Sequence, residues 1–417
     1  MAFSTVLRSI CVRLPRQQAC YKWNILRGGS SVQRMSSSLT SSFKVDDLRI
    51  QYSNKITETK PDSDTLIFGH NFTDHMLTVA WSQEAGWEAP CIQPFGNLPM
   101  HPASSVLHYG IELFEGMKAY CGDDNKIRLF RPWDNMTRMR KSAEKISLPD
   151  FDGDELVKCI SQLIRVDREW VPKVKPCSLY IRPTFISTEP TLGVNPPGKA
   201  LLYVILCPVG PYFRTGSFNP VSLYADRKNV RAWKGGSGDS KIGGNYGPTI
   251  KPQKDAEKLG CQQVLWLYGD QDNVTEVGTM NMMMMWHNMD GDLELITPPL
   301  DGTILPGVTR KALLELAHGW GEFKVTEKGF TMEELQTGLK DNKVLEVFGA
   351  GTACVVCPVG SILYKDEVLK IPTMDNGAPY ATRFYNTLLD IQYGNIPSDW
   401  VYDIDSEYDA LAAKIAS

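Results

Sequence analysis

Short apolar runs in the first half of the chain predict β-strands. Runs of strand length occur at 75–81 (HMLTVAW), 117–122 (MKAYCG) and 126–130 (KIRLF), and two longer ones follow, SLYIRPTFIS from Ser178 and ALLYVILC from Ala200. β-Branched and aromatic residues in runs of this length favour strands. None of the runs reaches the roughly 18 residues of a membrane-spanning helix, so we predict a soluble protein without a membrane segment.

A helix is predicted within this series of strands, beginning at about Asp134. Its apolar residues recur at spacings of three and four, and they form one buried stripe of Met136, Met139, Ala143 and Ile146. The carboxylate of Asp134 is suited to accept the free N–H groups of a first helical turn, so this residue is the predicted N-cap.

The second half of the chain mixes helices and strands. VSLYAD from Val221 predicts a strand, KPQKDAEKLG a helix that ends at Gly260, and LPGVTRKALLELAHGWG a helix that begins after Pro306-Gly307. Two apolar runs, CQQVLWLYG and VTEVGTMNMMMMW, flank the turn residues DQDN as a hairpin would, and VLEVFGAGTACVVCPVGSILY predicts two strands around a glycine turn. Methionine packs adaptably, so the run Met282–Met285 is predicted to lie in a core strand.

These elements predict an α+β (mixed α/β) protein with two domains. The segment 210–220, GPYFRTGSFNP, is rich in Gly, Pro and polar residues, which is typical of an interdomain connector. It would separate a smaller N-terminal domain, residues 45–209, from a larger C-terminal domain, residues 221–417.

Residues 1–44 differ from the rest in composition. They contain seven Lys or Arg residues, no Asp or Glu, and the serine-rich segment MSSSLTSS. This composition predicts a cleavable transit peptide, and hence a mitochondrial protein, although a basic tail on a cytoplasmic protein is the alternative. Without these seven charges the net charge falls from −4 to about −11. We therefore expect no nucleic-acid partner.

The cysteine pattern excludes a disulfide-rich scaffold and predicts no metal site. Ten cysteines are spread along 417 residues, and CVVC, Cys354–Cys357, is the only CxxC spacing. A zinc site would need a second pair or two well-spaced histidines. The pair is either two core cysteines of a buried strand or a redox-active dithiol.

Lys241 lies in GDSKIGGNYGP, a segment with too many glycines for a helix or a strand. A flexible surface loop is the plain interpretation. The alternative is amine chemistry, because glycines let a bulky cofactor approach the backbone and a lysine can attack a carbonyl group.

Two segments are suited to bind phosphate. The helix after Pro306-Gly307 presents the free N–H groups of Val308 and Thr309, and the turn GAGT adds the hydroxyl of Thr352. Either segment could equally be an ordinary helix start or a tight turn.

Polar residues within two apolar runs suggest binding groups. Tyr180 and Arg182 share one face of SLYIRPTFIS and could receive a carboxylate, although Pro183 also allows an exposed edge strand. Glu276 in VTEVGTMN needs a cationic partner if it is buried. If that cation is a protonated pyridine, then Lys241, Glu276 and the phosphate sites together describe a pyridoxal-phosphate enzyme.

Seven motifs in order support this interpretation. LFEGMKAY, LFRPWDNMTRMRKSA, SLYIRP, KIGGNYGP, EVGTMN, LPGVTR and GTACVVCPV resemble the branched-chain amino-acid aminotransferases, which are pyridoxal-phosphate enzymes of fold type IV with the cofactor at the domain interface. The resemblance runs from about Phe43 to Tyr393.

The resemblance implies a role for each residue that matches. Lys241 corresponds to the catalytic lysine, which binds pyridoxal 5'-phosphate and moves the Cα proton, Tyr246 to the partner of the cofactor's phenolic oxygen, and Glu276 to the partner of its ring nitrogen. The remaining cofactor contacts implied are Arg138, Thr279, Val308, Thr309 and Thr352. The substrate pocket implied consists of Phe68, Phe114, Tyr180, Arg182 and Ala353, with the partner subunit's Tyr109 and Val194 completing it in a homodimer.

The implied reaction is transamination of L-leucine, L-isoleucine and L-valine with 2-oxoglutarate, giving branched 2-oxo acids and L-glutamate by a ping-pong mechanism. Cys354 and Cys357 match the redox-sensitive cysteine pair of relatives of the vertebrate type. A D-amino-acid aminotransferase or an aminodeoxychorismate lyase would keep the lysine and glutamate and differ in the pocket. A thiol-based interaction module would not require Lys241.

Overall fold

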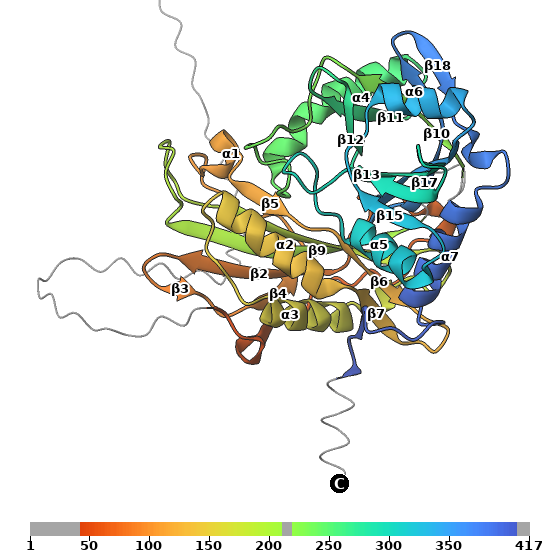
Figure 1. The fold of residues 1–417 in the computed structure, drawn as a ribbon. Coiled ribbons are helices and arrows are strands. Elements are labelled where there is room, and N and C mark those ends of the chain that lie inside the picture. Colours follow the sequence, from red (N-terminus) through yellow and green to blue (C-terminus); the bar gives the residue numbers. More distant parts are fainter. Residues whose placement is uncertain (1–41, 211–218, 407–417) are drawn as a thin grey trace, which may run out of the picture. The chain divides into compact units, whose positions relative to one another are not determined.

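Two β-sheets organise the described part of the chain, residues 42–210 and 219–406 of a computed structural model (Figure 1). All of these residues belong to one compact unit, Leu39–Ser417. The predicted leader lies outside the described residues except at its end, 42–44, and most of the predicted connector, 211–218, lies outside them too.

The first sheet has ten strands and is built almost entirely from the first half of the chain. Its main path is β1-β4-β2-β9-β8-β6-β7-β19, with β3 beside β2 and β5 beside β8. The long antiparallel pair β8 and β9 forms its centre. The strands are β1 (Arg49–Ile50), β2 (His75–Ser82), β3 (Gly86–Trp87), β4 (Cys91–Pro94), β5 (Glu112–Phe114), β6 (Met117–Cys121), β7 (Ile127–Phe130), β8 (Ser178–Ser187), β9 (Lys199–Val209) and β19 (Val401–Asp403).

The second sheet has nine strands and follows the segment 211–218. Its path is β12-β11-β10-β17-β16-β13-β14-β15, with β18 beside β17 and a further pairing of β12 with β13. The strands are β10 (Val221–Asp226), β11 (Gln263–Tyr268), β12 (Asn273–Val277), β13 (Met280–His287), β14 (Leu293–Thr297), β15 (Lys324–Glu327), β16 (Val344–Gly351), β17 (Val355–Tyr364) and β18 (Glu367–Lys370).

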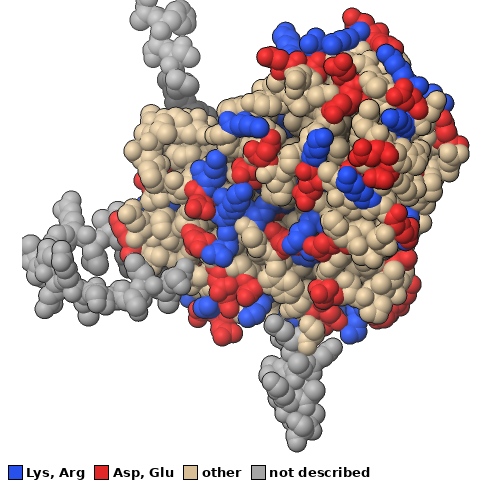
Figure 2. Space-filling model, in the orientation of Figure 1, with Lys and Arg blue, Asp and Glu red and all other residues tan. Residues whose placement is uncertain are grey.

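Helices cover both sheets. Apolar residues of α2 and α3 join the core of the first sheet, and those of α5 and α7 join a core shared with β13, β16 and β17. The helices are α1 (Val106–Tyr109), α2 (Pro132–Lys145), α3 (Gly153–Val166), α4 (Ile250–Lys258), α5 (Val308–Trp320), α6 (Met332–Lys340) and α7 (Pro379–Gln392). On the face of the molecule in Figure 2, acidic and basic side chains are interspersed.

The four consecutive methionines lie in a core strand, β13, as predicted. The surroundings of this strand explain why residues on both of its faces are apolar. Met282 and Met284 pack in one core with residues of α6, whereas Met283 and Met285 pack in the other with residues of α5. Strand side chains alternate between faces, and both faces of β13 are covered. All four side chains are therefore fully buried.

Two details of the predicted elements are wrong. Helix α2 begins at Pro132 with Arg131 as its N-cap, and the carboxylate of Asp134 instead pairs with Arg131 and Lys311. The predicted strand VTEVGTMNMMMMW is two antiparallel strands, β12 and β13, which reverse at Gly278 and Thr279. A positive φ of 54° at Gly278 permits this reversal.

The edge-strand alternative for SLYIRPTFIS is also wrong. Strand β8 pairs with β9 along its whole length, and with β5 and β6 on its other side. Pro183 lies where β5 has ended and β6 has not begun, opposite Glu115, whose N–H donates to the carbonyl of Pro183. The N–H that proline lacks therefore costs the sheet no ladder hydrogen bond.

Candidate active site

Lys241 is held in place by both its backbone and its side chain. Its N–H donates to Oγ of Ser142 on α2 at 2.8 Å, and its carbonyl accepts the N–H of Phe114 on β5 at 3.0 Å. Its Nζ donates to the hydroxyl of Tyr246 at 3.1 Å and lies 4.7 Å from the centre of the Phe114 ring. The interpretation of this segment as a flexible surface loop is therefore wrong.

The predicted substrate residues form a continuous group beside this lysine. The guanidinium of Arg182 lies 4.6 Å from the ring centre of Phe114, and its Nη2 donates to the hydroxyl of Tyr180 at 3.0 Å. Phe68 packs edge-on against Tyr180 at 4.9 Å between ring centres. Nε of Arg182 is buried without a hydrogen-bond partner among the described residues. The group thus combines apolar surface with an unsatisfied cationic donor.

Glu276 is almost fully buried at the end of β12, and its two oxygens differ. Oε1 accepts Nδ2 of Asn281 at 2.9 Å and the N–H of Leu305 at 3.1 Å. Oε2 lies 2.7 Å from Nε of Arg231 but accepts no hydrogen bond from a described residue. Burial raises the pKa of Glu276, against the lowering effect of Arg231. A further cationic N–H donor would satisfy Oε2 and stabilise the ionised carboxylate.

The start of helix α5 carries free backbone donors. The N–H groups of Val308 and Thr309 make no hydrogen bond to another described residue, as the first turn of a helix leaves them. A Cβ at Gly307 would overlap Oδ1 of Asn281, so only glycine allows the side chain of Asn281 to lie this close to the backbone at the start of α5. Free donors at the start of a helix of 13 residues are suited to bind an anion.

Arg138 reaches the same region from α2 and is bound by a residue that sequence reasoning missed. Its Nε and Nη2 each donate to Glu115 at 2.7 Å, and its Nη1 donates to the carbonyl of Pro306 at 3.0 Å. Glu115 also accepts Nδ2 of Asn135 at 2.8 Å and is fully buried. Its place between apolar residues in LFEGMKAY was the available signal, the same one that singled out Glu276.

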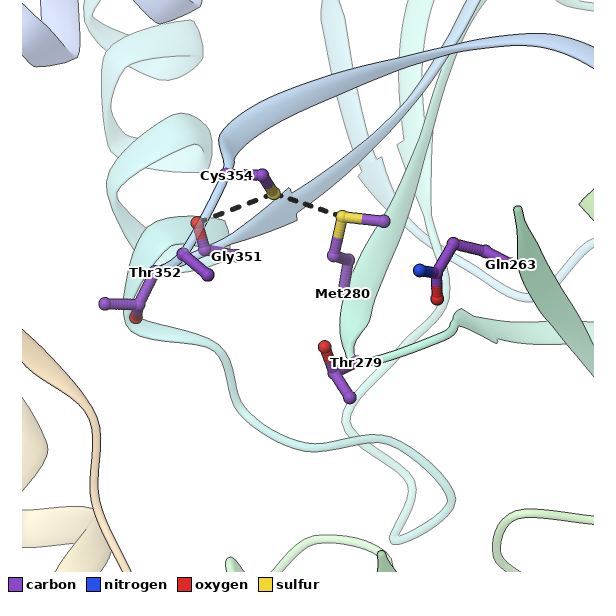
Figure 3. A pocket seen from close by; sticks show the side chains of 7 residues that line it. Gln263, Thr279, Met280, Gly351, Thr352 and Cys354 are labelled. Carbon is purple, nitrogen blue, oxygen red and sulfur yellow. Dashed lines mark hydrogen bonds between the residues drawn. The ribbon is translucent and has the colours of Figure 1, made fainter. Parts of the chain in front are cut away.

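Thr279, Thr352 and Ala353 line one pocket of about 30 Å³ (Figure 3). Thr279 comes from the turn between β12 and β13, and Thr352 and Ala353 from the turn between β16 and β17. Thr352 also borders a small space together with Thr309 of α5. Both predicted phosphate segments therefore meet at one place.

Tyr109 and Val194, the residues predicted to reach the partner's pocket, contact each other's segments rather than this group. The hydroxyl of Tyr109 donates to the carbonyl of Leu192, so the two segments contact each other. Side chains of Tyr109, Leu192 and Val194 are 41%, 66% and 75% exposed. No described contact joins Tyr109 or Val194 to Lys241.

The CxxC pair is buried beside the pocket as two free thiols. Cys354 follows Ala353 directly, and its Sγ contacts the sulfur of Met280 at 3.1 Å (Figure 3). Burial raises the pKa of Cys354 to about 12 and raises that of Cys357 further, so neither is a thiolate near neutral pH. These features agree with two core cysteines of a buried strand, and the redox-active dithiol stays a prediction.

We predict that alkylation will discriminate between the cysteines. Iodoacetamide at pH 8 should modify the partly exposed Cys91 well before Cys354 or Cys357 in the native protein, since a buried thiol with a raised pKa reacts slowly. Peptide mass spectrometry after short exposures measures the order. Equal rates in native protein, rather than only after unfolding in urea, would contradict it.

These groups fit pyridoxal 5'-phosphate by their own chemistry. A lysine amine stands beside a phenol, a buried carboxylate oxygen lacks a donor, and free helix N–H groups stand near an arginine. They suit the aldehyde and phenolic oxygen, the ring N–H and the phosphate respectively.

The amino-transferase class IV model matches residues 112–362. The cytosolic branched-chain-amino-acid aminotransferase of Mus musculus is 60% identical over 372 residues, covering 89% of this chain and 96% of the mouse protein. This chain belongs to the branched-chain-amino-acid aminotransferases.

Other members of this family agree. The mitochondrial branched-chain-amino-acid aminotransferase of Mus musculus is 56% identical over 366 residues, which cover 88% of this chain and 93% of the relative. The solved branched-chain amino acid aminotransferase of Escherichia coli has a TM-score of 0.61 and 25% identity, covering 78% of this chain and 99% of that one. The chain is thus an α+β, pyridoxal-phosphate-dependent aminotransferase of fold type IV. Among its described residues, no helix is long and apolar enough to cross a bilayer.

Proposed function

We propose that this protein transfers the amino group of L-leucine, L-isoleucine and L-valine to 2-oxoglutarate, with pyridoxal 5'-phosphate bound at Lys241. The observation that carries the proposal is the position of the Lys241 amine, between the Tyr246 hydroxyl and the Phe114 ring. When bound, the cofactor supplies an electron sink for the pair of electrons left on Cα.

The chain's own residues provide acid–base chemistry and charge. Lys241 would act as the base for the Cα proton, since its amine lies between the Tyr246 hydroxyl and the Phe114 ring. Glu276, held by Asn281 and Leu305, would stabilise a protonated ring nitrogen through its free Oε2. Val308, Thr309, Thr352 and Arg138 would hold the phosphate, and Thr279 would provide a further contact to the cofactor.

The pocket beside Lys241 suits both kinds of substrate in turn. Phe68, Phe114 and Tyr180 provide apolar surface for a branched side chain, and Arg182 with its unsatisfied Nε can meet the distal carboxylate of glutamate. Apolar contacts separate side chains that differ by one methylene by only about 1–3 kcal/mol. Leucine, isoleucine and valine should therefore all be substrates.

The exposed pair Tyr109 and Val194 supports a homodimer in which each subunit contributes them to the other's pocket. These two residues and Leu192 are exposed in the single chain, and burial of such apolar surface by a partner subunit would be favourable.

The leader composition supports a mitochondrial matrix protein, with the cytoplasm as the alternative. Phe43 is 3% exposed and packs edge-on against Trp87 at 5.1 Å. If the leader is removed, the cut should therefore precede Phe43, at least two residues before the boundary predicted from composition.

The visible spectrum of the purified holoenzyme tests the proposed reaction. The cofactor's yellow band should bleach on addition of L-leucine and return on addition of 2-oxoglutarate, because the two half-reactions are separate. A yellow protein that ignores leucine but responds to a D-amino acid would support the rival of the same fold. A protein that cannot be loaded with the cofactor would exclude both.

A further inference from the structure

Lys118 is a buried lysine that the proposed reaction does not use. It lies in β6, where Met117 and Ala119 face the core of the first sheet, so Lys118 points to the opposite side. Its Nζ donates to the carbonyl of Ala353 at 2.9 Å across the two sheets. The residue is only 6% exposed.

No carboxylate balances the charge of Lys118. Among the described residues it forms no ion pair, and the titratable groups that act on it are the thiols of Cys177 and Cys354. The ammonium has three N–H donors, of which Ala353 accepts one. Burial lowers the pKa of Lys118 to about 8. A buried cation of this kind is stabilised when an anion binds beside it.

The surroundings of Lys118 indicate where that anion would lie. Lys118 stands opposite Tyr180 in the pairing of β6 with β8, so it shares a face with Tyr180 and Arg182. It also borders the small space lined by Thr309 and Thr352. Lys118 thus lies between the face that carries Tyr180 and the turn that carries Thr352 and Ala353.

We propose that Lys118 is a positioning residue for the carboxylate of the amino-acid substrate. It fixes the turn between β16 and β17 through the carbonyl of Ala353, and its ammonium supplies positive charge on the side of the pocket formed by Ala353 and Tyr180. This rests on the proposed function. The phosphate of the cofactor is also an anion that Lys118 could stabilise, and the test distinguishes the phosphate from the substrate carboxylate.

The test compares ligands with and without a carboxylate on Lys118→Met holoenzyme. Dissociation constants of 4-methylvalerate and of 3-methylbutylamine are measured from the change in the cofactor's visible band. The acid should bind about 10- to 100-fold more weakly to the variant, as expected for loss of a charge-assisted contact, and the amine within about 2-fold of wild type. Affinity of the apoenzyme for pyridoxal 5'-phosphate should also change by less than about 2-fold.

Two controls keep the outcome decisive. Lys126→Met removes an exposed lysine of the same β6–β7 hairpin and should change none of these constants. If thermal unfolding shows that Lys118→Met is not folded, Lys118→Gln, which keeps an N–H donor but not the charge, takes its place.

If the acid and the amine both bind more weakly to the variant by the same factor, Lys118 has only a structural role. If only the affinity for pyridoxal 5'-phosphate falls, Lys118 serves the phosphate. If none of the dissociation constants changes, Lys118 is not part of the site. A wild-type protein without activity on leucine would instead overturn the proposed function.

Discussion

Replacing Lys241 with alanine is expected to abolish transamination. The amine is the group placed to bond the cofactor and to move the Cα proton, and no other described lysine amine contacts Tyr246. Loss of a positioned general base alone costs up to about 10⁴-fold in rate, so kcat should fall by about that factor. Single-turnover measurements with L-leucine, following the cofactor's visible band, give the size of the loss.

A lysine of the following helix is the matched control. Lys251 lies in α4, ten residues further on, with a side chain that is 83% exposed. Lys251→Ala should keep full activity and the wild-type spectrum. If Lys241→Ala retained a wild-type spectrum and more than about a tenth of the activity, the base would have to be sought elsewhere.

The second large effect is expected from Glu115→Gln, which leaves the buried Arg138 without its counter-charge. Burial acts to raise the pKa of Glu115, but the charge and hydrogen bonds of Arg138 outweigh it and lower the pKa. Removing one partner of a buried ion pair costs about 3–5 kcal/mol, so the free energy of unfolding should fall by about 3 kcal/mol. Urea unfolding of the apoenzyme at pH 7 measures the change.

Helix α2 offers an internal comparison for this result. Arg140, two residues after Arg138, makes the same two-point contact with Asp150, at 2.7 and 2.6 Å, but on the surface. Asp150→Asn should cost less than about 1 kcal/mol, because water already screens that pair. Similar losses for the two variants would show that burial does not strengthen the Glu115 pair.

The pH dependence of the Glu115 effect has a defined sign. A folded pKa below the unfolded value near 4.5 stabilises the native state fully above pH 4.5, and this contribution is lost as the pH falls through the folded pKa. The stability difference between wild type and Glu115→Gln should therefore shrink in acid. A difference that grows below pH 4.5 would contradict the assignment of Glu115 as an ionised partner.

The elements with a strong local pattern were predictable from the sequence. Helix α5 begins after Gly307 as expected, because Pro306-Gly307 cannot continue a strand and the apolar period is unbroken. The buried methionines of β13 were also predicted. The N-cap of α2 was not predicted correctly, because the carboxylate of Asp134 forms ion pairs with Arg131 and with Lys311, which lies in a helix distant in sequence.

What the sequence by itself determined is the set of reactive groups: a lysine among glycines, a carboxylate in an apolar strand, and helix donors after Pro306. Motif order was enough to indicate the family. Only the tertiary structure decided which charges are satisfied, because Glu115 with Arg138, Arg231 with Glu276, and Lys118 with Ala353 are brought together across 23, 45 and 235 residues of sequence. Local sequence carries no record of such pairings, which arise when segments distant in sequence pack together and exclude water.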